Sequence, residues 1–176
     1  SNNIAQMIIC TFAADYGQAR NLTARWRLTP IALSGNVATF ETVDGTTRVL
    51  KNVMGLWLVQ ECKRSWQRQG TDYSYEELTR LASEATPFAS LIQPDDESFL
   101  LPSDMTAAIV NFCNKTGQKA PSSPGATVRC ALESLALKYR WVMERLEELS
   151  GKRIEVIHIV GGGCQNQLLC QFTADA

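Results

Sequence analysis

The sequence has few of the residues from which metal sites are built. It contains one histidine, His158, and none of its six cysteines stands in a CxxC pair. Zinc sites usually combine several such ligands at close spacing. The composition therefore disfavours a zinc site, and the cysteines are expected to be reduced, mostly buried thiols of a cytoplasmic protein. Cys113 and Cys130 lie on neighbouring predicted helices, and the sequence leaves open whether they form a disulfide.

The sequence also lacks an excess of charge of either sign and any long apolar run. Its 17 basic and 18 acidic residues give a formal net charge of −1, which argues against a nucleic-acid-binding surface. No apolar run reaches the roughly 18 residues that a membrane span requires. Met7–Ala14 is apolar, but it is short and has no basic region before it, so we do not interpret it as a signal peptide. A length of 176 residues, 45% of them hydrophobic, fits one globular domain.

The residues that are present begin with one clear pattern, a β-hairpin. Val37–Val43 and Thr46–Leu50 are rich in strand-forming residues and flank Asp44-Gly45, a pair typical of tight hairpin turns. Ile4–Ala14 is compatible with a helix or a strand, and residues 1–28 as a whole carry no motif.

A buried helix is predicted next, over residues 52–69. Asn52 is its expected N-cap, and Gly70 follows its end. The first half is apolar on all sides, which indicates burial. Gly55 inside it would cost about 1 kcal/mol relative to alanine, so we expect close packing there. Gln60 is the first polar residue after this apolar turn; it could face a cleft, but the pattern alone favours the start of a solvated half.

Three more helices are predicted from their caps and apolar faces. Ser74 and Glu77 form a capping box for a short helix over roughly residues 75–85, and another helix spans Asp104–Thr116. The longest helix starts at Ser123, has Pro124 at its first position, and is closed by Gly151. Its apolar residues recur every three or four positions, as in an amphipathic core helix: Val128, Leu132, Leu135, Tyr139, Val142, Leu146 and Leu149.

Acidic residues outside these apolar stripes are interpreted as solvated surface groups. They are the acidic turn Asp95, Asp96 and Glu97, and Glu144, Glu147 and Glu148 of the long helix. The long helix is expected to be a core scaffold without chemistry of its own.

The C-terminal stretch holds the main candidate for a binding site. Ile154–Val160 is typical of a buried strand, Gly161, Gly162 and Gly163 follow, and a helical pattern opens at about Gln165. Glycines allow positive φ and close approach of a ligand, and a helix N-terminus favours anions. The turn lacks the GK[ST] of a Walker loop and the GxGxxG spacing of a dinucleotide fold. On the glycines alone, an anion such as a nucleotide and a plain tight turn are about equally favoured.

Two motifs, in this order, resemble the C-terminal domain of the FGGY carbohydrate kinases. They are RVLKNVMGLWLVQE (Arg48–Glu61) and HIVGGGCQNQLLCQFTADA (His158–Ala176). The DGTTRVLKN junction and CALESLALKYRWV in the long helix belong to the same resemblance, which covers roughly Thr29 to Ala176. It divides the chain into an unmatched segment, residues 1–28, and a partial nucleotide-binding domain, residues 29–176. Because a strand–helix unit is usually followed by another strand, we expect the chain to be cut at its C-terminus.

The resemblance implies an α/β domain of the actin-like ATPase (ribonuclease-H-like) fold, incomplete here, with a small helical insert before the long helix. Such kinases transfer the γ-phosphate of ATP, with Mg²⁺, to a sugar hydroxyl, and two domains close over the cleft. By resemblance, the ATP-binding residues are Gln60, Gly161, Gly162, Gly163 and Asn166, with Gly162 foremost. This assignment reverses the solvated interpretation of Gln60. Asn52 matches a sugar-contacting asparagine, a role that can coexist with helix capping.

Within the family, RVLKN-x-MGLWL favours the branch that phosphorylates the 1-hydroxyl of L-rhamnulose over those acting on xylulose, glycerol or gluconate. The family's catalytic aspartate lies before the matched region, and we place it on neither Asp15 nor any other residue. No metal ligand is assigned either. We expect the base, the first phosphate loop and most of the sugar pocket to belong to an N-terminal domain in cis, and the fragment alone to be inactive. A non-catalytic nucleotide-binding remnant and, for residues 1–28, a frameshift are the alternatives.

Overall fold

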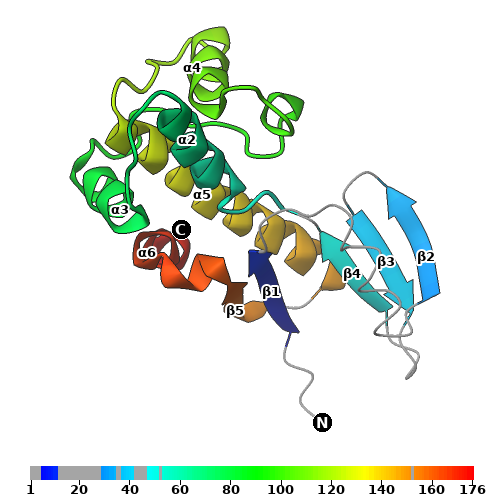
Figure 1. Cartoon of the computed structure of the whole chain (residues 1–176). Helices are drawn as coiled ribbons and strands as arrows, with labels where there is room; N and C mark the ends of the chain where they lie inside the picture. The colour runs from blue at the N-terminus through cyan, green and yellow to red at the C-terminus, as the bar shows by residue number, and fades with distance from the viewer. Residues whose placement is uncertain (1–4, 12–28, 35–36, 42–46, 52, 152) are drawn as a thin grey trace. The chain divides into compact units, whose positions relative to one another are not determined.

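The computed structural model describes residues 5–11, 29–34, 37–41, 47–51, 53–151 and 153–176 (Figure 1). The chain forms two compact units: Ser1–Phe12 with Met54–Ala176, and Ala13–Val53. Among the helices in the described ranges, none combines the length and the apolarity of a membrane-spanning segment.

The described part of unit Ala13–Val53 is an antiparallel sheet of three strands, in the order β2-β3-β4. The strands are β2 (Thr29–Ser34), β3 (Val37–Glu41) and β4 (Thr47–Lys51). Because β3 and β4 pair from Val37–Lys51 to Glu41–Thr47, the predicted hairpin is confirmed, and β2 adds a strand that was not predicted. The turn Asp44-Gly45 and the predicted cap Asn52 lie outside the described residues.

The larger unit is a group of helices around one long helix. The helices are α2 (Trp57–Arg68), α3 (Tyr75–Glu84), α4 (Met105–Lys115), α5 (Pro124–Ser150) and α6 (Gln167–Asp175), with short 3₁₀ helices η1 (Glu97–Phe99) and η2 (Gly162–Gln165). Figure 1 shows α5 passing along α2, α3 and α6, and these three helices all contact it. Helix α4 packs on α2.

The predicted caps of α3 and α5 are present. Ser74 accepts a hydrogen bond from the Glu77 amide at 3.0 Å, and Ser123 accepts one from the Ala126 amide at 3.2 Å. Gly151 ends α5 in the left-handed conformation with φ +65°. These short-range contacts satisfy amide groups that a helix end leaves unpaired, so the boundaries follow from local sequence.

The helix predicted over residues 52–69 corresponds to α2, and its predicted start at Asn52 is wrong. Helix α2 begins at Trp57 after an Leu56 cap without a side-chain hydrogen bond, so Gly55 lies outside the helix. The reason is tertiary, because the Met54 amide donates to Asp95 Oδ1 at 3.3 Å instead of belonging to a helix. Asp95 also forms an ion pair with Lys138 of α5 at 3.0 Å. Asp95 is therefore an anchor between segments and not a solvated acid.

A parallel pair of strands completes this unit. Strand β1 (Ala5–Thr11) pairs with β5 (Ile154–Gly161), with Ile9 opposite Ile159. In the described residues this sheet has two strands, and Val156 is 42% exposed. None of the side chains at residues 154–159 is buried, so the prediction that β5 is a buried strand is wrong. Glu147, which was expected to be solvated, accepts a hydrogen bond from the Ile154 amide at 2.6 Å and ties the end of α5 to the start of β5.

The core lies along the apolar stripe of α5. Val128, Leu132, Leu135 and Tyr139 are fully buried, as the spacing predicted. Buried thiols fill gaps beside the stripe: Cys62, Cys113 and Cys130 are buried and free. Cys113 and Cys130 interact as thiols and are not joined by a disulfide, and burial raises the pKa of Cys130 to about 12.

Candidate functional site

The glycine turn lies at the carboxyl ends of β1 and β5. Thr11 is opposite Gly161, where both strands end, and the chain then enters η2 at Gly162. The Gly163 carbonyl accepts a hydrogen bond from the Asn166 amide at 3.1 Å, which closes the turn before α6 starts. Ligands of parallel α/β sheets bind at this edge, because the strands there deliver loops and helix N-termini to one place. The turn is thus where the sequence placed it, although α6 starts at Gln167 and not at Gln165.

Asn166 stands at the start of α6, as its N-cap. Its Oδ1 accepts a hydrogen bond from the Leu169 amide at 2.9 Å. Its Nδ2 donates to Thr79 Oγ1 of α3 over a longer distance of 3.4 Å. The prediction of a position just inside the helix is corrected by one residue, since Asn166 is the cap. The half-buried side-chain amide of Asn166 is held by α6 through its oxygen and by α3 through its nitrogen.

A hollow of about 350 Å³ lies between α3 and α6, beside this amide–hydroxyl contact. Most of the side chains around it are polar: Thr79, Arg80, Ser83, Gln167 and Gln171, with the apolar Leu168. Arg80 is held by an exposed ion pair with Glu84 at 2.7 Å. The hollow shares Thr79 with the Asn166 contact and has the start of α6 as one wall, so it lies next to the helix that follows the glycine turn.

Two cysteines follow the turn, in different surroundings. Cys170 Sγ lies 3.8 Å from the carbonyl oxygens of Gly163 and Cys164. Partial burial, followed by the nearby Cys164, raises the pKa of Cys170. The Cys164 side chain is exposed on η2, so it is a natural chemical reporter for anything that covers the turn.

The remaining predicted site residues are on other elements. Gln60 lies on α2 and is half-buried. Its backbone N–H donates to the Leu56 carbonyl at 2.9 Å in the first turn of the helix. Because α2 and α6 both contact α5, the long helix is the common support of Gln60 and the glycine turn. Asn52 lies outside the described residues. The structure therefore brings Asn166 and the three glycines together at one junction and leaves Gln60 on a separate helix.

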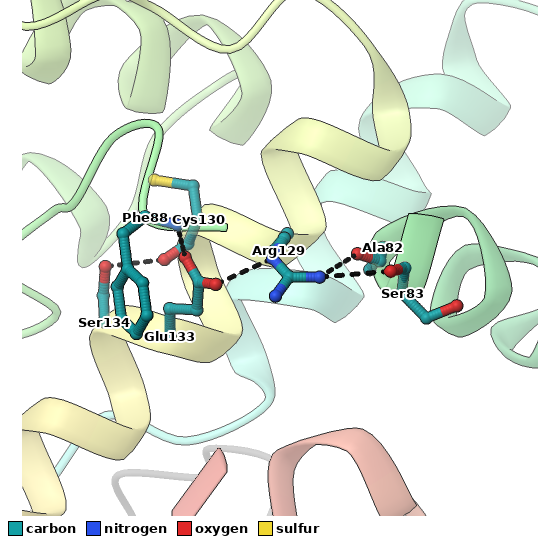
Figure 2. A network of polar contacts seen from close by, with 7 residues as sticks. All are labelled: Ala82, Ser83, Phe88, Arg129, Cys130, Glu133 and Ser134. Carbon is teal, nitrogen blue, oxygen red and sulfur yellow. Dashed lines mark hydrogen bonds and ion pairs between the residues drawn. The ribbon is translucent and has the colours of Figure 1, made fainter. Parts of the chain in front are cut away.

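The sequence reading missed a buried polar network on α5 (Figure 2). Arg129 Nε donates to Glu133 Oε1 at 2.7 Å, and Arg129 Nη1 donates to the carbonyls of Ala82 and Ser83 at 3.1 and 3.2 Å. Glu133 Oε2 accepts from the Phe88 amide at 2.8 Å. The signal for this network was present, because opposite charges four residues apart stand within a mostly apolar stretch of the helix.

Comparison with known proteins places the chain in a family. Residues 14–176 match the C-terminal domain of the FGGY family of carbohydrate kinases, starting upstream of Thr29, where the motif resemblance starts. The chain is 44% identical over 174 residues to a rhamnulokinase of Bacteroides thetaiotaomicron, covering 93% of the chain and 35% of the relative. It is 37% identical over 148 residues to a rhamnulokinase of Bacillus subtilis, covering 84% of the chain and 30% of the relative.

A further relative is a rhamnulokinase of Enterobacter sp., 35% identical over 189 residues, with 100% of the chain and 37% of the relative covered. The chain thus spans about a third of the length of these relatives. The family match implies the actin-like ATPase fold, and the described residues show an α/β arrangement with a parallel strand pair and flanking helices. The chain belongs to the FGGY family of carbohydrate kinases, in the region of its C-terminal domain.

Proposed function

We propose that this chain is the nucleotide-binding part of a rhamnulokinase, which transfers the γ-phosphate of ATP to the 1-hydroxyl of L-rhamnulose. The observation that carries the proposal is the glycine turn at the carboxyl edge of β1 and β5, followed by the capped N-terminus of α6. Similarity to rhamnulokinases over 93% of the chain supports the branch of the family. The setting we infer is cytoplasmic carbohydrate metabolism.

The residues at the turn fit a nucleotide. Gly161, Gly162 and Gly163 have no side chains to fill the space at the strand ends, so adenosine can approach the backbone. The side-chain amide of Asn166 contacts Thr79, which lines the hollow beside α3, and the side-chain amide of Gln60 on α2 is the second that we assign to ATP. Asn52 is the proposed sugar contact. The Mg²⁺ that accompanies ATP would neutralise charge on the phosphates, and we assign it no ligand in this chain.

Phosphoryl transfer needs positioning and electrostatic stabilisation more than covalent chemistry. In this proposal the chain positions the nucleotide, while the sugar hydroxyl gives its proton to a base in an N-terminal domain outside these 176 residues. We propose that residues 29–176, together with strand β1 that pairs with β5, form part of the nucleotide domain. The chain alone should therefore show no kinase activity. Phosphorylation of L-rhamnulose by the pure chain would contradict this division of roles.

Calorimetric titration of the chain with MgATP tests the nucleotide assignment. We expect binding by the wild type and none by Gly162→Asp, because a carboxylate in the turn repels phosphates and fills the space for adenosine. Gly117→Asp is the matched control, since it adds the same carboxylate at a glycine that follows α4. Circular dichroism verifies that each variant is folded. A folded wild-type chain that binds no MgATP would contradict the proposal that this chain forms the site.

Alkylation of Cys164 gives a second, local readout. A nucleotide on the glycine turn should shield the exposed Cys164 thiol, so MgATP should slow its reaction with iodoacetamide in the wild type but not in Gly162→Asp. Mass spectrometry identifies the modified residue. Binding without protection of Cys164 would place the nucleotide elsewhere.

The identity of the sugar is tested on the longer protein that contains this chain. We expect L-rhamnulose to be phosphorylated in preference to xylulose, glycerol and gluconate. A preference for one of these three would keep the family and change the branch. No phosphorylation of any sugar, with nucleotide binding retained, would favour a non-catalytic nucleotide-binding protein.

A further inference from the structure

Arg129 connects three helices through one buried side chain. It is 9% exposed and forms an ion pair with Glu133, which is 2% exposed, one turn further along α5. Its Nη1 donates to the carbonyls of Ala82 and Ser83, in the last turn of α3 (Figure 2). Its guanidinium carbon also lies 5.0 Å from the centre of the Phe172 ring of α6. One guanidinium thus contacts both helices that border the hollow.

Glu133 extends the connection to the segment that follows α3. Its second carboxylate oxygen accepts a hydrogen bond from the Phe88 backbone amide. The hydroxyl of the neighbouring Ser134 accepts one from the Ile92 backbone amide at 2.9 Å. The chain leaving α3 is therefore fastened to α5 at two backbone amides. The last carbonyls of a helix lack partners within the helix, and a cation there is favourable, so Arg129 acts as a C-terminal cap supplied by another helix.

Stability alone does not require this pair. A buried ion pair seldom stabilises a fold more than apolar side chains of similar size would, because both charges must be desolvated. Apolar side chains could not make directional hydrogen bonds. The planar guanidinium presents its donors to Glu133 and to the α3 carbonyls in fixed geometry. The pair therefore determines where the end of α3 lies relative to α5 and α6.

The position of α3 matters for the glycine turn. Thr79 of α3 contacts the Asn166 amide and lines the hollow between α3 and α6. A displaced α3 would move Thr79 away from Asn166 and release the amide that we assign to the nucleotide. The cap at the C-terminus of α3 and the contact at Thr79 lie one turn apart on the same helix, so the first controls the second.

We propose that Arg129 and Glu133 are positioning residues for the nucleotide site: they hold α3 against α6 so that Thr79 orients Asn166 at the glycine turn. This inference rests on the proposed nucleotide binding, and α3 becomes a functional wall of the site. Neither residue touches the nucleotide.

The test compares three forms of the chain with the wild type. Arg129→Met leaves Glu133 buried without its cation. Arg129→Met/Glu133→Met removes both charges and keeps apolar volume. Arg145→Met/Glu148→Met is the matched control, because this pair also lies on α5 but is exposed, with side chains 56% and 61% accessible. The readouts are the midpoint of thermal unfolding, amide hydrogen exchange of α3 with α4 as reference, and affinity for MgADP.

We expect Arg129→Met to unfold at a lower temperature and to exchange faster in α3. The double variant should regain the unfolding midpoint, since no buried charge lacks its partner. In the double variant, the amide hydrogens of α3 should still exchange faster than in the wild type when those of α4 serve as the reference. Its affinity for MgADP should be about 10- to 100-fold weaker than that of the wild type, because a small displacement of a supporting group is enough for such a loss. The exposed-pair control should match the wild type in all three readouts.

A double variant with wild-type exchange in α3 and wild-type affinity would overturn the inference and leave the nucleotide site intact. A folded wild-type chain without MgADP affinity would instead overturn the proposed function, and with it the role of the pair in binding. The α3 exchange of the double variant would then still decide whether the pair positions α3.

Discussion

Gly125 of α5 lies so close to Leu81 of α3 that a Cβ at position 125 would stand 2.7 Å from the Leu81 carbonyl carbon. The two nearest atoms, the carbonyl oxygen and carbon of Leu81, belong to the backbone, so they cannot rotate away as a side chain can. Gly125 is one helical turn before Arg129, and the two residues therefore bring α3 onto α5 by different means. Glycine allows the close approach, and arginine fixes it with hydrogen bonds.

Gly125→Ala is therefore expected to destabilise the chain. Alanine is favoured over glycine inside a helix by about 1 kcal/mol, but overpacking against backbone costs more, and we expect a net loss of about 1–3 kcal/mol in free energy of unfolding. Urea denaturation measures it. Gly117→Ala is the control: space is open there, but φ is +71°, so we expect a loss of about 1 kcal/mol without displacement of α3. A Gly125→Ala chain as stable as the wild type would show that α3 and α5 do not meet this closely.

Tyr139→Phe should leave stability unchanged or raise it by up to about 1 kcal/mol. Among the described residues, the Tyr139 hydroxyl is buried without a hydrogen-bond partner, and burial raises its pKa. Phenylalanine keeps the ring in the core and removes the desolvated hydroxyl. Tyr75→Phe, on a side chain that is 50% exposed, should have no effect. A loss above about 1 kcal/mol at position 139 would mean that the hydroxyl has a partner.

Asp104→Ala should lower stability at neutral pH, and the effect should fade in acid. Partial burial raises the pKa of Asp104, but hydrogen bonds from Thr106 and Ala107 outweigh it and hold this pKa below its usual range. A lowered folded-state pKa means that the stabilisation is complete above the unfolded value of about 4 and is lost as pH falls through the folded value. We expect a cost of about 1 kcal/mol at pH 7 that shrinks below pH about 4.

Urea denaturation between pH 7 and pH 2 measures this dependence. Ser123→Ala removes an N-cap of the same kind that does not titrate, so its cost should stay constant with pH. An Asp104→Ala cost that is equally constant would show that the carboxylate charge contributes nothing.

Alkylation should separate the cysteines by burial. Only the thiolate reacts, and burial raises the pKa of Cys62 and, to about 12, that of Cys130. Cys164 is exposed. At pH 8 in native buffer, iodoacetamide should modify Cys164 faster than Cys62 or Cys130 by about a hundredfold or more. The difference should vanish in denaturant, and equal native rates would mean that the core around α5 opens readily.

Local chemistry in the sequence predicted the starts of α3 and α5 and the glycine turn. Ser74 and Ser123 each cap a helix through the backbone amide three residues further along. The two partners are close in the sequence, so the sequence alone indicates them. The turn at Gly161–Gly163 is likewise specified by neighbours along the chain. Asn166 was predicted just inside α6 and is instead its N-cap.

Long-range contacts account for what the sequence did not predict. The start of α2 is displaced by the contact of Met54 with Asp95, 41 residues further along the chain. No residue near Met54 in the sequence indicates this contact. The Arg129–Glu133 pair was visible as a spacing, but its partners in α3 lie 46 and 47 residues away. Thr79 and Asn166 are 87 residues apart, so only a folded chain shows that α3 borders the glycine turn.

The pairing of β1 with β5 has a consequence for folding kinetics. Ala5 faces Ile154 and Thr11 faces Gly161, so the sheet closes a loop that contains almost the whole chain. The entropy of loop closure must be overcome before these contacts contribute, whereas neighbouring helices can associate earlier. We expect the sheet, and the glycine turn at its end, to form after the helices around α5. A nucleotide that binds only the closed turn would shift this last step toward the native state by mass action, so the ligand would help to complete its own site.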